Sequence, residues 1–115
     1  MNPGDLVMGL EIIKSMLEEE LDRKKRAVDS FNNELKNPEL KKIYIKNVNG
    51  NSYFYENDNE GGKFHYKMIG SIKEMPESEK NRLMENSQRY ENNINSIRSL
   101  NDDIFKLERM VKIIG

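Results

Sequence analysis

Apolar residues recur every three or four positions along the first third of the chain, which is the spacing of an amphipathic helix. They are Leu10, Ile13, Leu17, Leu21, Val28, Phe31 and Leu35. The pattern is typical of a coiled coil with one stutter, and Lys24 occupies a place that the period assigns to an apolar residue. Asn37-Pro38 ends the pattern, because the residue before a proline is driven out of the helical conformation. The sequence therefore predicts a helix over about 3–37.

The last third of the chain repeats with a period of seven. The repeated positions are Leu83, Tyr90, Ile97, Ile104 and Val111, supported by Ile94 and later by Leu100, Leu107 and Ile114. Asn86, Asn93 and Asn101 lie on or near this stripe, where polar residues cost stability but fix register and oligomeric state. Pro76 suits a first helical turn. We predict a second helix over about 76–114.

Between these segments the period changes to two, which indicates strands. Three such runs cover about 42–47, 52–56 and 63–69, with a longer turn over 58–62. Asn49-Gly50 joins the first two, and both residues tolerate the positive φ of a tight hairpin turn. One face collects Tyr53 and Tyr55, with Phe64, Tyr66 and Met68 adding apolar surface. The result is a three-stranded meander over about 41–70, which is marginal alone and must pack on the helices or a second subunit.

The predicted fold class is mainly α (α+β): two long antiparallel coiled-coil-like helices joined by a small three-stranded antiparallel β-meander, in a single domain over 1–115. Two thin helices bury little apolar surface, and chains of this size are already marginal. We therefore expect a homo-oligomer, with a dimer favoured. Residues 18–26 change from acidic to basic within a few positions, which favours antiparallel or staggered pairing with a complementary chain.

Composition narrows the chemistry. The chain has 115 residues, of which 36% are hydrophobic and 34% charged, and it has no cysteine, which excludes disulfides, thiolate metal sites and cysteine catalysis. No apolar run approaches the roughly 20 residues of a membrane span, so we expect a cytoplasmic protein with no membrane partner. His65, the only histidine, has no acidic residue at a ligand spacing. We predict no metal, no cofactor and no enzymatic activity.

Charge is unevenly distributed along the chain. Residues 41–73 carry six lysines against three acidic residues, whereas the rest carries 13 basic and 17 acidic residues. One interpretation is that the lysines protect sheet edges from aggregation while the tyrosines face the helices. The other is that a basic, tyrosine-rich sheet contacts phosphates and stacks on bases. Its candidate residues are Lys42, Lys46, Lys63, Lys67, Tyr53 and Tyr55.

The sheet segment also carries a resemblance. Its motifs are Lys46-Asn47-Val48-Asn49-Gly50-Asn51-Ser52-Tyr53-Phe54-Tyr55, then Gly61-Gly62-Lys63, then Lys67-Met68-Ile69-Gly70. The chain resembles a family of small uncharacterised archaeal and bacterial proteins that place a Tyr-rich, Gly-Lys-containing β-hairpin between two long charged helices. The resemblance implies this architecture in a prokaryotic protein and carries no activity. The layout is also similar to that of prefoldin-type chaperone subunits, and aromatic strands of this kind occur in some transposases and integrases.

Three functions follow as hypotheses. The first is a non-enzymatic coiled-coil interaction and assembly protein whose oligomer seam uses the two apolar stripes. The second is a nucleic-acid-associated accessory protein of mobile-element type that uses the basic sheet. The third is a prefoldin-like chaperone, which requires exposed apolar surface at the open helix ends.

Overall fold

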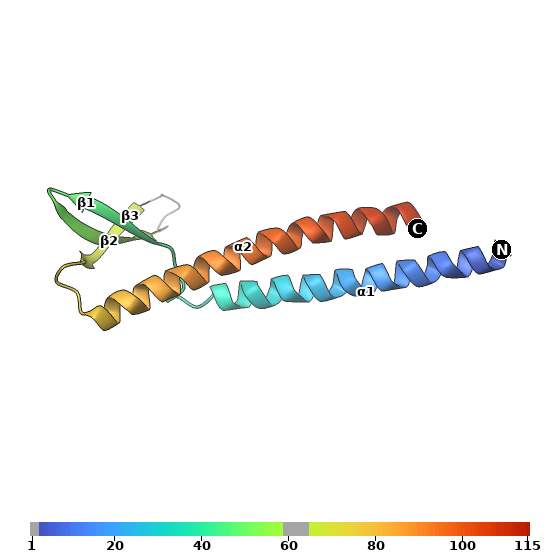
Figure 1. Ribbon diagram of the computed structural model, residues 1–115, viewed down its shortest axis with the longest axis horizontal. Helices are drawn as coiled ribbons and strands as arrows, with labels where there is room; N and C mark the ends of the chain where they lie inside the picture. Colours follow the sequence, from blue (N-terminus) through green and yellow to red (C-terminus); the bar gives the residue numbers. More distant parts are fainter. Residues whose placement is uncertain (1–2, 59–64) are drawn as a thin grey trace. The chain divides into compact units, whose positions relative to one another are not determined.

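The chain forms two long helices and a three-stranded sheet, in the order α1 (Pro3–Leu35), β1 (Ile43–Val48), β2 (Asn51–Asp58), β3 (His65–Ser71) and α2 (Glu77–Ile114) (Figure 1). The computed structural model describes the backbone of residues 3–58 and 65–115 and the side chains of residues 9–57 and 65–115. The predicted fold class is confirmed. Two compact units make up the chain, Met1–Glu34 with Ile94–Gly115 and Leu35–Asn93. We call them the helix unit and the sheet unit, and α2 contributes to both.

In the helix unit, α1 packs against the C-terminal part of α2 in the antiparallel sense (Figure 1). Lys24 of α1 pairs with Asp103 of α2, whereas Lys14, ten residues earlier, borders a cavity with Gly115 at the end of α2. Moving toward the start of α1 therefore means moving toward the end of α2. This is the arrangement that the two apolar stripes predict.

The less exposed positions of the helix unit follow a strict three–four alternation. On α1 they include Lys14, Leu17, Leu21, Lys24, Val28 and Phe31, and on α2 Ile97, Leu100, Ile104, Leu107, Val111 and Ile114. The expected stutter is absent, because the alternation passes through Lys14 rather than Ile13. The long aliphatic stems of Lys14 and Lys24 cover apolar surface while their ammonium groups reach water or a carboxylate. None of the described side chains in this unit is fully buried, since two helices cannot enclose each other.

In the sheet unit, β1, β2 and β3 pair in sequence order as an antiparallel meander. Asn49 and Gly50 form the first turn with φ of 53° and 81°, as the sequence predicts. Asp58 belongs to β2, and the remainder of the second predicted turn lies outside the described residues. A β-bulge opposite Phe54 and Tyr55 interrupts the β2–β3 register. Ile69 is the extra residue there, and a bulge of this kind re-aims the side chains around it.

A small apolar core supports the sheet unit. Among the described side chains only Leu40, Phe54 and Leu83 are buried hydrophobics. They come from the α1–β1 linker, the central strand and α2. The Ile43 amide donates to the Ser87 Oγ at 3.0 Å, which ties β1 to α2. Such a small core leaves little reserve, because each buried side chain contributes only a few kcal/mol.

A proline lies in each of the two segments that connect the sheet to a helix. After α1, the Glu39 amide donates to the Asn37 Oδ1 and the Leu40 amide to the Asn37 carbonyl, both at 3.0 Å. This turn places Leu40 in the core. Before α2, the Pro76 carbonyl accepts from the Lys80 amide at 3.1 Å, so Pro76 precedes the first turn.

Candidate interaction surfaces

The register of the sheet gathers four tyrosines on one face. Direct cross-strand partners share a face, and Tyr44 pairs with Tyr55 while Lys46 pairs with Tyr53. On β3, Met68 pairs with Tyr55, and Tyr66 lies two residues away on the same side of that strand. We call this set the tyrosine face; it consists of Tyr44, Lys46, Tyr53, Tyr55, Tyr66 and Met68.

Lys46 lies among the rings of the tyrosine face. Its Nζ is 3.8 Å from the centroid of Tyr66 and 5.1 Å from that of Tyr55, which are cation–π distances. The rings of Tyr44 and Tyr66 meet edge to face, with centroids 5.2 Å apart and planes at 84°. Aromatic pairs favour that geometry. The face therefore combines an array of rings with a positive charge held between them.

The opposite face of the sheet, which we call the core face, consists of Ile43, Ile45, Phe54, Glu56 and Lys67. Glu56 and Lys67 are direct cross-strand partners, so their opposite charges lie side by side. Among the described side chains of the sheet, the tyrosine face has no carboxylate. The register thus separates Lys46, which has no ion pair with a described side chain, from Glu56, the acidic residue of the sheet whose side chain is described.

The structure divides the candidate nucleic-acid residues between these faces. Lys46, Tyr53 and Tyr55 share the tyrosine face. Lys42, next to it, has its Nζ 5.2 Å from the Tyr44 centroid and 3.3 Å from a Glu91 carboxylate oxygen. Lys67 lies on the core face, and Lys63 lies outside the described residues.

Sequence reasoning did not place Tyr44 with the candidate residues. The signal was present, because the two-residue turn at Asn49-Gly50 fixes the β1–β2 register and sets Tyr44 opposite Tyr55. Tyr66 needed the β2–β3 register, which the bulge shifts.

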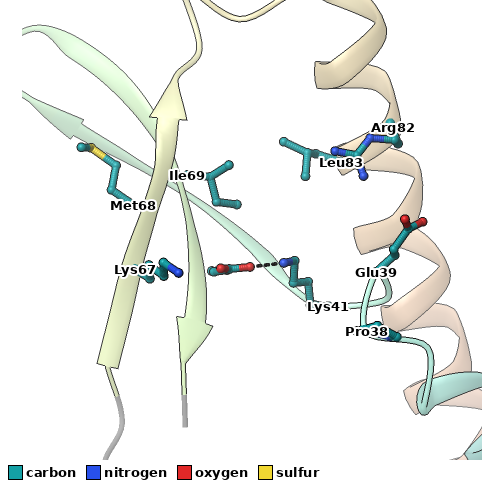
Figure 2. A pocket seen from close by; sticks show the side chains of 9 residues that line it. Pro38, Glu39, Lys41, Lys67, Met68, Ile69, Arg82 and Leu83 are labelled. Carbon is teal, nitrogen blue, oxygen red and sulfur yellow. Dashed lines mark ion pairs between the residues drawn. The ribbon is translucent and has the colours of Figure 1, made fainter. Parts of the chain in front are cut away.

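A cavity of about 370 Å³ lies between β3, the start of α2 and the linker before β1 (Figure 2). Ile69 and Leu83 point toward each other across it, and Lys41 forms an ion pair with Glu56 (Figure 2). Met68 points away from Ile69, on the other side of β3 (Figure 2), and its pairing with Tyr55 places it on the tyrosine face. An apolar contact and an ion pair border this cavity, with no nucleophile beside a base, so the geometry indicates packing rather than a reaction centre.

The predicted seam residues differ in exposure. Leu83 is buried, Leu10 and Ile13 are exposed, and the others are half-buried, namely Leu17, Leu21, Val28, Phe31, Leu35, Tyr90, Ile94, Ile97, Ile104, Leu107 and Val111. The structure brings Leu21 and Val111 to one cavity of the helix unit and Leu10 and Ile114 to another.

Two residues of the seven-residue column on α2 belong to the sheet unit instead. Leu83 borders the cavity beside Ile69. Tyr90 borders a smaller cavity of about 140 Å³ with Tyr44 and Asn57. The column therefore continues along α2 while its partner changes from the sheet to α1.

Large apolar side chains that lie outside the observed three–four alternation are exposed on the helix unit. They are Ile12, Ile13 and Met16 on α1 and Phe105, Met110 and Ile113 on α2. Four of them flank the open helix ends and form what we call the end patch: Ile13, Met16, Met110 and Ile113. Sequence reasoning assigned only Ile13 of these four, because it counted a single stripe per helix.

An ion network shows that the end patch lies on one flank. Lys24 Nζ is 3.4 Å from Glu20 and 3.5 Å from Asp103, so these carboxylates share one side of the helix pair. Ile13 precedes Glu20 by seven residues, and Met110 follows Asp103 by seven. Residues seven apart lie on the same side of a helix in a coiled coil, so both helices present their patch residues to the same flank.

The network also perturbs Glu20. Hydrogen bonds from Arg23 and then Lys24 lower the pKa of the Glu20 carboxyl below its ordinary value of 4.5. A depressed folded-state pKa adds stability above the unfolded value, and this stability is lost as the pH falls below 4.5 through the lowered pKa.

We expect the Glu20 carboxyl carbon to titrate below pH 4.5 in an NMR titration of the whole chain. Arg23→Gln combined with Lys24→Gln removes both donors and is expected to return the midpoint toward 4.5. An unchanged midpoint in this double variant would contradict the assigned cause.

Among residues 9–57 and 65–115, no group of three His, Cys, Asp or Glu side chains is placed to hold a metal ion. His65 is an exposed residue at the start of β3. No helix in the described part of the chain is long and apolar enough to cross a membrane.

Comparison with other proteins gives no relative. No protein-family model, curated protein or solved structure matches this chain. The resemblance to small prokaryotic proteins with a Tyr-rich hairpin therefore stays a prediction. Its Asn49-Gly50 turn and its tyrosine strands are as the motif implies, whereas Gly61-Gly62-Lys63 lies outside the described residues.

Proposed function

We propose that this chain is a non-catalytic interaction module that assembles with a second copy of itself through the end patch of the helix unit. The observation that carries the proposal is the exposure of this patch in a unit whose described side chains form no buried core. Ile113 is 80% exposed, and Ile13, Met16 and Met110 are also exposed. Exposed apolar patches rimmed by charged residues are typical of protein interaction sites.

Two-fold symmetry supports a second copy as the occupant. A two-fold contact places the same patch on both sides, so apolar side chains meet apolar side chains.

Self-association predicts a melting temperature that rises with protein concentration, because folding and association are linked. We expect sedimentation equilibrium to give a dimer for the unaltered chain. The double variant Met110→Glu with Ile113→Glu is expected to be a monomer, because a dimer would then bury four carboxylates. The matched control is Met84→Glu, an exposed methionine of the same helix in the sheet unit, which should remain a dimer. A concentration-independent monomer of the unaltered chain would overturn the proposal.

A second candidate function uses the same patch. Exposed apolar side chains at open helix ends are what a prefoldin-like chaperone needs to hold an unfolded client. Slower aggregation of a denatured client, abolished by Met110→Glu with Ile113→Glu, would favour this function. Failure to slow aggregation would remove it and leave self-assembly as the use of the patch.

A further inference from the structure

We infer that the tyrosine face binds single-stranded nucleic acid, with the rings stacking on bases and Lys46 contacting phosphates. This site lies in the sheet unit and shares no residue with the end patch of the helix unit. Nucleic-acid binding by the tyrosine face can therefore be tested independently of self-assembly through the end patch.

The first step is the accessibility of the rings. Phe54 fills the core face, so the tyrosines are not required there. Tyr66 is 43% exposed, and Met68 beside it is exposed as well. Base–aromatic stacking needs one accessible ring surface and tolerates any base, because every base has a π face.

The second step is charge complementarity. The tyrosine face has Lys46 at its centre and no described carboxylate among its members, whereas Lys42 at its edge already pairs with Glu91. Glu56 lies on the core face, where it pairs with Lys41 and lies beside Lys67. Segregation of the acidic residue to the far side leaves a positive, aromatic surface that fits a phosphate backbone with unstacked bases.

The third step selects the form of the nucleic acid. The rings lie on strands of a sheet and can stack only on bases that are already unpaired. In a duplex the base faces are covered by their neighbours. The Lys46 Nζ lies over one face of the Tyr66 ring, 3.8 Å from its centroid, so a base stacks on the other face of that ring or displaces the ammonium group toward its phosphate. We therefore expect a preference for single strands without marked sequence specificity.

The test is fluorescence anisotropy of a labelled oligo(dT) and oligo(U) of about 12 nucleotides with the full chain. Tyr66→Leu is expected to weaken binding about fivefold or more, the lower end of the effect of losing one stacked base. Tyr66→Phe keeps the ring and should bind within about twofold of the unaltered chain. Equal binding by Tyr66→Leu and Tyr66→Phe would overturn the inference.

The salt dependence of oligonucleotide binding provides a second measurement. It does not depend on Tyr66→Leu, so it remains informative if that variant fails to fold. Between about 50 and 200 mM salt, Lys46→Gln should lower the slope of log K against log salt by about 0.7, as expected when one phosphate contact to a single strand is lost. Lys67→Gln, the same change on the core face, should leave the slope unchanged. Equal slopes in both variants would contradict the assignment.

A labelled duplex and a labelled polyglutamate peptide complete the design. Weaker binding of the duplex than of the single strand is expected. Absence of oligonucleotide binding at about 50 mM salt, or tighter binding of polyglutamate than of oligo(U), would overturn the inference, the latter by assigning the face to an acidic protein partner.

Discussion

Phe54→Ala is expected to lower the free energy of unfolding of the sheet unit by about 3–5 kcal/mol, the usual cost of removing a buried phenylalanine ring. Phe54 is 3% exposed on the central strand, where it pairs with Ile45 and Gly70. Only two other apolar side chains among the described residues are buried, so no neighbouring core can refill the cavity. Whole domains are stable by only about 5–15 kcal/mol, and the loss takes most of that margin.

Near-ultraviolet circular dichroism is the measurement, because four of the tyrosines lie on this sheet and lose their fixed environment when it unfolds. Urea titration of the unaltered chain and of Phe54→Ala gives the difference in stability. The matched control is Ile45→Ala on the same face, where the side chain is 56% exposed. Its change should stay within about 0.5–1 kcal/mol. Equal losses in the two variants would show that Phe54 does not anchor the sheet.

The hairpin turn illustrates what the sequence determines locally. Asn49 and Gly50 tolerate positive φ, and the structure has both residues there. That turn alone sets the β1–β2 register and therefore the membership of each face across these two strands. The seven-residue repeat likewise predicts an antiparallel helix pair, because two stripes on one chain must meet.

What the sequence could not determine is which face of the sheet meets the core. Both faces carry large apolar or aromatic residues, so a period of two gives the alternation but not its direction. The structure buries Phe54 and leaves the tyrosines on the other side. The buried aromatic residue of the core face is therefore Phe54 and not a tyrosine. Of the tyrosine face, Tyr44 borders a small cavity with Tyr90 of α2. Gly70 is a signal for the bulge at Ile69, because a glycine inside a strand often marks one, but only the β2–β3 register identifies the extra residue.

The sequence also did not determine which residue near the start of α1 faces α2. Ile13 and Lys14 are adjacent, and hydrophobicity selects the isoleucine, whereas the three–four alternation selects the lysine. A lysine stem can take the place because its charge reaches past the seam. Choosing Lys14 frees Ile13 for the flank, where it becomes part of the end patch. The ion network that identifies this flank depends on Lys24 and Asp103, 79 residues apart, and needed the fold.

Asn93→Leu is expected to raise the free energy of unfolding by about 1–3 kcal/mol, because it removes a buried polar group that lacks a partner. Asn93 is 6% exposed on α2, and its Nδ2 makes no hydrogen bond within the protein. Leucine is similar in size and adds apolar surface. We expect the melting temperature to rise by about 4 °C or more. Asn101→Leu is the control, since Asn101 is exposed and its change should stay within about 0.5 kcal/mol.

The same substitution also tests what the buried Asn93 contributes to the apolar stripe of α2. A buried asparagine disfavours registers in which it would face only apolar side chains, and so selects one pairing at a cost in stability. Asn93→Leu should therefore be more stable and less uniform, with an NMR spectrum that has more than one set of amide signals where the unaltered chain has one. A variant that is more stable and still uniform would show that residues other than Asn93 select the register of the helix pair. A variant that is less stable would show that the Asn93 amide has a partner in solution, and that the asparagine contributes stability rather than specificity.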